Sequence, residues 1–549
     1  MTHESERLDE ARAAYEIRDW EVARDGFIAA SRTEPLPAGD RYALARCWWW
    51  IGDLEACSAN LEDAHVRALE EGRTELAATA ALELGLAHLL RGNEPVGSGW
   101  IGRAGRLAAE LPEAAIHGYL ALVLEVDPDF SGAEPTGTRD AARRVRDIGR
   151  RCGDPTLVAA GLHGEGRALI GAGDVSAGMA LLDEAMVAVL AGEVDGTWAG
   201  NLYCATIGAC HDLGDFRRMA QWTEAMQRWL DELPAAALFA GDCRVHRAQL
   251  LILRGEWDRA AREAERACEE LETVSVMNAA EAWYEVGEVR RRRGDLQAAE
   301  DAYRTAHGLG RDPEPGFALL RLAQGRVEAA STSIGAAMLT GTTDSVGRAR
   351  LCAAQVEIAL AAGRLEVARR ACGELHEIAA ACASPGLEAM AGAARGAVLL
   401  AAGRPEQALA PLRKACRLWR ELDVPDEAAR TGVLLARTYS GLDDTEAARR
   451  ELDAAASMFD RLGAYAEAAR RAVRHGSQPR PYGLSDRELE VLRLVADGRN
   501  NPQVAEALVI SRRTVARHMS NIFVKLGVSS RTEAARFALD HGLLPERWH

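Results

Sequence analysis

The chain has 549 residues, carries a formal net charge of −16 and is 48% hydrophobic, while aromatic residues make up only 5%. Alanine is abundant, and a chain rich in this strong helix former and poor in aromatics favours helix-on-helix packing over sheets. No run of 18 or more apolar residues occurs and the start is acidic, so we expect no membrane span and no signal peptide. Eleven cysteines without a Cys-x-x-Cys pair indicate reduced thiols, and we therefore expect a cytoplasmic, all-α protein.

A glycine recurs through the first 475 residues at intervals of 31 to 41 residues, usually followed by Asp, Glu or Arg. The glycines are Gly52, Gly92, Gly132, Gly173, Gly214, Gly255, Gly294, Gly325, Gly363 and Gly403. Five positions later many units have a small residue: Cys57, Gly178, Ala260, Ala299, Ala330, Ala368 and Ala408. Glycine allows a left-handed turn and the small residue lets two helices approach, so each unit is predicted to be a helical hairpin. One hairpin cannot bury its own apolar face, which predicts stacking into a solenoid.

This pattern resembles tetratricopeptide repeats, most clearly over residues 160–460, although the units are longer than the usual length of about 34 residues. Two interruptions, Asp127–Gly137 and Asp312–Pro315, are predicted to be loops. The short interval of 31 residues before Gly325 predicts a shortened unit.

Motifs for catalysis are missing from the sequence. The only lysines are Lys414 and Lys525, and neither stands in the Gly-Lys-Ser/Thr of a P-loop. No HExxH, GxSxG or kinase signature occurs, so we expect neither an enzyme nor a bound cofactor.

Two clusters in the repeats have alternative interpretations. Cys204, Cys210-His211 and Cys243-x-x-His246 could form a metal or redox site, but their spacing is not that of a zinc finger and packing is the favoured interpretation. The run Arg290–Arg293 is interpreted as a solvated helix end before Gly294 rather than as a nucleic-acid patch.

The segment His475–Gly483 contains two prolines in nine residues and ends the repeats. It divides the chain into a repeat domain (1–475), a linker (476–482) and a C-terminal domain (483–549). The C-terminal domain has ten cationic and eight anionic side chains, or +2, which leaves −18 for the rest of the −16 total. Because so acidic a body repels the phosphate backbone, nucleic-acid contact is expected only at the C-terminal end.

The C-terminal domain is predicted to contain four short helices. Ser485–Glu488 and Ser530–Glu533 fit the capping box at a helix start. Asn501-Pro502 fits a helix cap followed by proline at the first helical position. Ser511 fits the N-cap of a third helix, after a turn too short for another element.

The third helix, Ser511–Leu526, has two chemically opposite faces. An apolar stripe is formed by Val515, Ile522 and Leu526, and a polar face by Arg513, Arg517 and Ser520. The stretch has four cations and no acidic residue. This pattern predicts a helix-turn-helix unit that presents the third helix to DNA.

The stretch Leu484–Ala538 resembles the LuxR-type DNA-binding domain of bacterial transcription regulators. The matching positions are Arg487-Glu488, Val491-Leu492, Gly498, Asn501, Val504-Ala505, Leu508, Ser511, Thr514-Val515, His518, Asn521-Ile522, Lys525-Leu526-Gly527 and Arg531. Two positions depart from the family pattern: Asn500 replaces the usual Ser or Thr, and Ala516 replaces a common basic residue.

The resemblance implies roles for individual side chains on double-stranded DNA. In the major groove the base-contacting residues would be Arg517, Arg513, Ser520 and Ala516, with Arg517 the main reader because alanine at 516 weakens that position. The phosphate-contacting residues would be Gln503, Arg512, Thr514, Lys525 and Arg531. A homodimer through the last helix would use Val528, Thr532, Ala535 and Leu539.

A repeat body followed by a LuxR-type domain resembles the class of the maltose-regulon activator, without the nucleotide-binding motor of that class. We therefore expect a transcription regulator whose body binds an unknown ligand or protein and controls the presentation or dimerisation of the helix-turn-helix. The alternative is a protein-interaction scaffold in which DNA binding is secondary.

Overall fold

The computed structural model describes residues 3–126, 135–233, 237–340, 345–463, 482, 484, 486–508, 510–541 and 543. Every regular element in these ranges is a helix, which confirms the all-α prediction. None of the helices in these ranges is long and apolar enough to cross a membrane.

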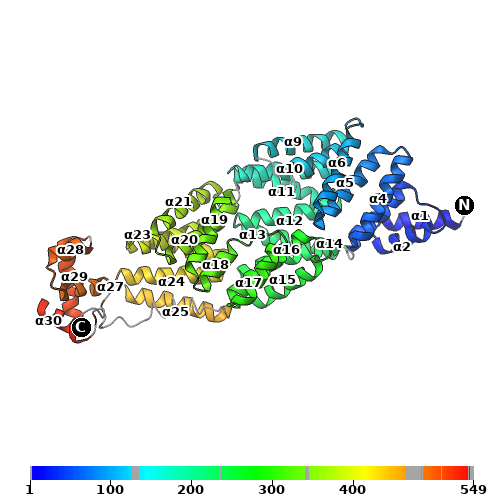
Figure 1. The fold of residues 1–549 in the computed structure, drawn as a ribbon. Coiled ribbons are helices and arrows are strands. Elements are labelled where there is room, and N and C mark those ends of the chain that lie inside the picture. The colour runs from blue at the N-terminus through cyan, green and yellow to red at the C-terminus, as the bar shows by residue number, and fades with distance from the viewer. Residues whose placement is uncertain are drawn as a thin grey trace.

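Successive helices of the body pack as hairpins along the chain (Figure 1). The first half contains α1 (His3–Glu16), α2 (Trp20–Ser31), α3 (Ala38–Ile51), α4 (Leu54–Glu70), α5 (Thr74–Leu90), α6 (Glu94–Ala108), α7 (Ala115–Ala121) with the π-helical η1 (Leu122–Val126), α9 (Pro135–Cys152), α10 (Pro155–Gly171), α11 (Val175–Leu190), α12 (Gly196–Asp212) and α13 (Phe216–Asp231). The second half contains α14 (Ala237–Leu253), α15 (Trp257–Leu271), α16 (Val276–Arg293), α17 (Leu296–Gly308), α18 (Gly316–Ala323), α19 (Val327–Thr340), α20 (Ser345–Ala361), α21 (Leu365–Cys382), α22 (Pro385–Ala401), α23 (Pro405–Glu421), α24 (Pro425–Gly441) and α25 (Thr445–Leu462). The predicted helical-hairpin solenoid is confirmed.

The recurring glycines form the turns inside the hairpins. Nine of the ten adopt φ between 69° and 91°, the left-handed conformation that side chains disfavour, and the tenth, Gly132, lies outside the described residues. After three of these glycines an aspartate caps the next helix, as when Asp53 accepts the backbone N–H of Ala56 at 2.9 Å, whereas Glu256 and Asp295 make no such bond. Arg18 and Asp443 take the left-handed position in the first and last hairpins, so the glycine pattern missed both.

The small residues lie where the two helices of a hairpin meet. Cys57 and the five predicted alanines are at most 1% exposed, which confirms their packing role. In two hairpins glycines face each other: a Cβ on Gly166 would lie 2.7 Å from the carbonyl oxygen of Gly178, and one on Gly85 would lie 2.9 Å from that of Gly97. At these crossings only glycine permits the observed backbone approach.

The two predicted loops and the predicted shortened unit are confirmed only in part. Asp312–Pro315 is a loop, and α18 has only eight residues, so the shortened unit is confirmed. The predicted loop Asp127–Gly137 is wrong at its end, because α9 already begins at Pro135; residues 127–134 lie outside the described residues. The linker also lies outside them, except for Tyr482.

The body winds so that distant hairpins touch. Helix α3 packs on α14, and α11 packs on α21. The Arg46 guanidinium is 2.9 Å from Asp195, 149 residues away, and that of Arg292 is 3.0 Å from Asp426, 134 residues away. The Ser384 hydroxyl donates to the carbonyl of Leu213, 171 residues earlier. The coil is therefore closed between its successive turns rather than open.

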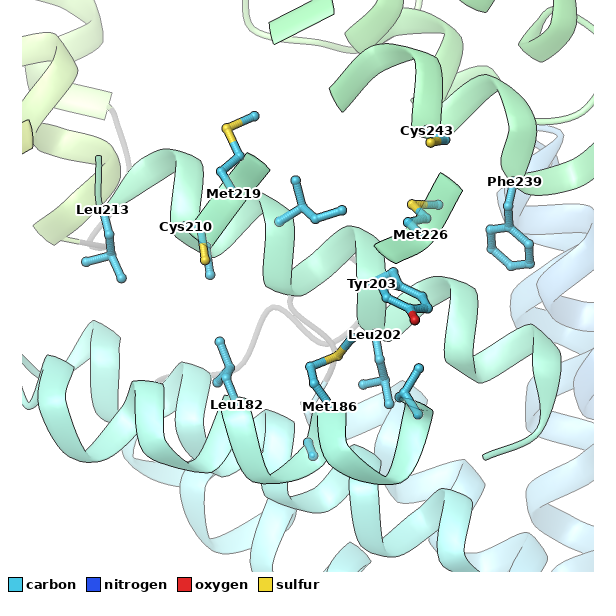
Figure 2. Close-up of a cluster of buried hydrophobic side chains, with 14 of the residues drawn as sticks. Leu182, Met186, Leu202, Tyr203, Cys210, Leu213, Met219, Met226, Phe239 and Cys243 are labelled. Atoms are coloured by element: carbon cyan, nitrogen blue, oxygen red, sulfur yellow. The ribbon is translucent and has the colours of Figure 1, made fainter. Parts of the chain in front are cut away.

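The largest apolar cluster joins residues of helices from α1 to α22, and Figure 2 shows part of it. Leu182 and Met186 of α11 point toward Leu202 of α12, and Met226 and Cys243 continue the cluster on α13 and α14. Cys210 and Cys243 are at most 1% exposed, and no three His, Cys, Asp or Glu in the described ranges are placed to hold a metal ion. These cysteines are packing residues of the core.

The arginine run ahead of Gly294 is engaged in ion pairs. Arg290 pairs with Glu265, Arg291 with Glu288, Arg292 with Glu288 and Asp426, and Arg293 with Asp258. The run does end a helix, but the prediction that it is solvated is wrong, because its side chains are only 11–37% exposed and their ion pairs fasten α16 to α15 and α24.

Candidate nucleic-acid interface

Four helices follow the body: α27 (Asp486–Ala496), α28 (Asn501–Leu508), α29 (Arg512–Leu526) and α30 (Arg531–Asp540). They surround one apolar core, made of Leu484, Leu489, Val491, Leu492, Val495, Val504, Ala505, Val515, Met519, Ile522, Ala534, Ala538 and Leu543. Helix α29 contacts the other three, so the core fixes its orientation and leaves one face to solvent.

The start of α28 corrects one sequence prediction. Asn500, not Asn501, is the cap: its side-chain oxygen accepts the N–H of Gln503 at 3.0 Å, and the Gln503 side chain accepts the N–H of Asn500 at 2.9 Å. Asn501 is already helical and accepts from Arg531 at 2.8 Å. The apparent departure at Asn500 therefore keeps the chemistry of a capping residue, since Asn caps helices as well as Ser does.

The other predicted caps are partly tested. Ser485 lies outside the described residues, so the first capping box stays a prediction. Ser530 caps α30 by accepting the N–H of Glu533 at 3.2 Å. The Glu533 carboxylate, however, bonds the backbone N–H of Ser529 at 2.7 Å, one residue before the position expected for a capping box.

Helix α29 begins and ends as predicted. The Ser511 hydroxyl accepts the N–H of Thr514 at 3.1 Å, and Gly527 ends the helix with φ of 66°. Val515 and Ile522 are fully buried and Leu526 is partly buried. The exposed face contains Arg512, Arg513, Ala516, Arg517, Ser520 and Val524.

The arginines on this face are free to bind an anion. Within the described ranges, no hydrogen bond or ion pair engages Arg512, Arg513 or Arg517. Because a guanidinium has five N–H donors and stays charged, three unpaired ones on a 15-residue helix favour phosphate or guanine as partner.

The other predicted phosphate contacts have partners within the domain. Lys525 lies 2.8 Å from the carboxylate of Glu488, and Arg531 bonds Asn501 and the carbonyl of Arg499. The Thr514 hydroxyl is 2.7 Å from that of Ser511. These bonds hold the helices together, and their phosphate roles stay predictions.

The predicted dimerisation residues lie around α30. Thr532 is exposed and Leu539 is 58% exposed, whereas Val528 and Ala535 pack partly against the core. Beside them, the rings of Phe537 and His541 stack at 4.0 Å.

One apolar side chain on the exposed face was missed by the sequence reasoning. Val524 is 83% exposed and lies four residues after Ser520, on the face of the arginines. The helical spacing from Arg513, Arg517 and Ser520 would have identified it.

Comparison with known proteins agrees with this geometry. Residues 483–538 match the family described as bacterial regulatory proteins, luxR family. The chain is 47% identical over 62 residues to the uncharacterized transcriptional regulatory protein YhcZ of Bacillus subtilis, which is 11% of this chain and 29% of that protein. It is 46% identical over 68 residues to the transcriptional regulatory protein LiaR of Bacillus subtilis, 12% of this chain and 32% of that protein. The similarity thus spans about a third or less of these relatives.

Solved structures resemble the helical body at low sequence identity. Cut9, from the crystal structure of the APC/C hetero-tetramer Cut9-Hcn1, aligns over 87% of this chain and 97% of its own, with a TM-score of 0.45 and 13% identity. A Rap protein complexed with competence and sporulation factor aligns over 71% of this chain and 99% of its own, with a TM-score of 0.38 and 12% identity. The chain therefore joins a body of stacked helical hairpins to a C-terminal helix-turn-helix domain that matches the luxR family over residues 483–538.

Proposed function

We propose that this protein regulates transcription by binding double-stranded DNA, and that its helical body senses a ligand or a protein partner and controls how the helix-turn-helix is presented or paired. The proposal rests on the exposed face of α29, where Arg513, Arg517 and Ser520 lie in a row. The apolar core on the other side of this helix fixes its orientation. A helix of this kind reads base edges in the major groove.

The contacts divide by chemistry. Arg517 and Arg513 are the candidates for bidentate bonds to guanine, and Val524 is a candidate for contact with the thymine methyl group. Gln503 at the start of α28 and Arg512 at the start of α29 would bind phosphates, because helix N-termini favour anions. Thr514, Lys525 and Arg531 would do so only by sharing their present partners.

The negative charge of the body supports DNA contact through the C-terminal domain and other contacts through the body. Because residues outside the C-terminal domain carry −18, the body is repelled by the duplex and is left to other partners. Pairing of two chains through α30 would place two copies of α29 on successive half-sites. Light-scattering masses of the chain, free and on its duplex, test this pairing.

The test of DNA recognition uses the full chain. Duplexes are selected from a randomised pool, and the preferred duplex and a shuffled one are titrated by fluorescence anisotropy at about 150 mM salt. Regulation predicts a preference of about 1,000-fold or more. Equal, weak and strongly salt-dependent binding of both would favour the scaffold alternative.

A further inference from the structure

The short helix α28 is held at both of its ends by arginines from other helices. At its C-terminal end, Nη2 of Arg487 in α27 donates to the carbonyl oxygen of Leu508, the last residue of α28, at 2.5 Å. At its N-terminal end, Nη1 of Arg531 in α30 donates to the side-chain oxygen of Asn501 at 2.8 Å. Nη2 of the same arginine donates to the carbonyl oxygen of Arg499 in the preceding loop. The two guanidinium groups therefore tie α28 to α27 and to α30.

Helix α28 has little else to fix its position. It has eight residues, of which only Val504 and Ala505 are buried. A helix of about two turns is marginal in isolation, and so small an apolar face leaves its place dependent on polar bonds as well. The carbonyl of Leu508 belongs to the last turn and has no partner within the helix, and a cation there also interacts favourably with the helix dipole.

Both arginines are already engaged, which distinguishes them from the unpaired arginines of α29. Nη1 of Arg487 pairs with Glu490 at 2.6 Å. Arg531 has no carboxylate within 4 Å in the described ranges, and its two bonds go to neutral oxygens. A phosphate bound by Arg531 would compete with the bonds that tie α28 to α30.

The position of α28 matters for DNA recognition. In a helix-turn-helix the first helix of the pair crosses the DNA backbone while the second lies in the major groove, and here these helices are α28 and α29. Gln503 at the start of α28 and Arg517 on α29 can bind one duplex together only if the two helices keep their relative place.

We propose that Arg487 and Arg531 are positioning residues, which hold α28 so that its N-terminus meets the phosphates while α29 meets the bases. The inference rests on the proposed function and deepens it, because it assigns Arg531 to positioning instead of phosphate contact. Arginine suits this role, since two N–H groups of one planar side chain bond two separate oxygens at once.

Hydrogen exchange of the free full-length chain tests the hold on α28 without DNA. Arg487→Gln and Arg531→Gln should each speed the exchange of residues 501–508 by about tenfold, because hydrogen bonds to charged groups are the strong ones. Helix α29 has its own face in the core and should keep its protection, which shows that the domain is still folded. Arg536→Gln removes an exposed cation of α30 and is the control. Unchanged exchange of residues 501–508 in both variants overturns the inference.

Variants that keep the charge distinguish positioning from phosphate contact. Lysine binds a phosphate as a point charge, but it lacks the fork that reaches two oxygens. Arg531→Lys and Arg487→Lys should therefore lower the ratio of affinities for the preferred and the shuffled duplex by about tenfold, and Arg536→Lys should not. The dependence on salt of binding to the shuffled duplex should stay as in the wild-type chain.

The contrary result is equally specific. If Arg531 is a phosphate contact, Arg531→Lys keeps the wild-type affinities, while Arg531→Gln weakens both duplexes alike and lowers the slope of log K against log salt by about 0.9. That outcome overturns the assignment of Arg531. Faster exchange of α28 with unchanged selectivity limits both arginines to stability and overturns the positioning role.

The failure of this inference can be told from the failure of the proposed function. A wild-type chain that prefers no duplex contradicts the proposed function, and with it any role in recognition, while exchange of the free chain still decides whether the arginines hold α28. A selective wild-type chain whose selectivity survives in all the variants contradicts the positioning role alone.

Discussion

The ammonium of Lys525 lies 2.8 Å from a carboxylate oxygen of Glu488, whose side chain is only 1% exposed. The pair joins the end of α29 to the start of α27, so it holds the candidate DNA-reading helix α29 against α27. A lysine that sequence resemblance assigns to phosphate contact thus has a structural role as well.

Replacing Lys525 by Met should loosen the C-terminal domain. The buried carboxylate of Glu488 would lose its cation, and since the lysine is about a third exposed, we expect a loss of about 1–3 kcal/mol rather than the larger value of a fully buried pair. Hydrogen exchange in α27 and α29 measures the loss. The double variant Glu488→Leu/Lys525→Met should recover much of it, and a single variant as stable as wild type would show that the pair contributes little.

Replacing Arg517 by Ala should relax the choice of base without unfolding the domain. The side chain is exposed and makes no internal bond in the described ranges, and a bidentate bond to guanine discriminates by about 1–3 kcal/mol. The measurement is the base-preference profile from selected duplexes. Arg536→Ala, which removes an exposed cation from α30, is the control, and identical profiles for wild type and Arg517→Ala would identify another residue as the reader.

Replacing Asn500 by Ala should destabilise α28. The substitution removes the oxygen that accepts the N–H of Gln503, a loss of about 0.5–2 kcal/mol. Asn500→Ser should be close to neutral, because serine caps equally well. Hydrogen exchange of residues 501–508 compares the two variants; equal protection in both would mean that the cap does not limit the opening of this helix.

Replacing Gly386 by Ala should strain the contact between turns of the coil. An added Cβ would lie 2.5 Å from the carbonyl oxygen of Gly214, so either helix α22 or the turn between α12 and α13 would have to move. We expect a loss of about 1–3 kcal/mol. Gly373→Ala is the control, because its Cβ meets nothing within 4 Å and alanine favours the helix, so thermal unfolding should shift in opposite directions for the two variants.

Acid should destabilise the body through His163. This histidine of α10 is 6% exposed, its Nε2 has no hydrogen-bond partner in the described ranges, and burial lowers its pKa to about 3. Below pH ~6.5 this histidine is protonated in the unfolded chain but stays neutral in the folded chain. The free energy of unfolding therefore falls between pH ~6.5 and ~3 by up to ~1.4 kcal/mol per pH unit. His163→Leu should flatten the unfolding temperature between pH 7 and 5, while His541→Gln on the surface should not; an unchanged slope in His163→Leu would assign the acid sensitivity to other groups.

Local chemistry explains which parts of the fold could be predicted. The left-handed turn at Gly52 and the buried alanine at 260 follow from spacing alone, because both are properties of one hairpin. The Arg46–Asp195 and Arg292–Asp426 pairs could not be predicted, since they depend on how far each hairpin rotates against the next. That rotation accumulates over several units and leaves no periodic signal.

The candidate nucleic-acid interface also contains some features that the sequence predicts and others that it does not. The exposed Arg517 and buried Val515 follow from helical periodicity, and the cap at Ser511 from residue type. Asn500 and Asn501 are both good caps, so the sequence could not decide between them.

The hydroxyl of Ser384 on the backbone of Leu213 has a consequence for how this protein can evolve. Open arrays of repeats gain or lose whole units easily, because each unit touches only its neighbours. Here an extra hairpin inserted between α13 and α22 would shift one coil past the other and separate partners that lie 171 residues apart. The number of hairpins is therefore constrained as tightly as the residues within them, and duplication of a unit is a mutation that this body should not tolerate.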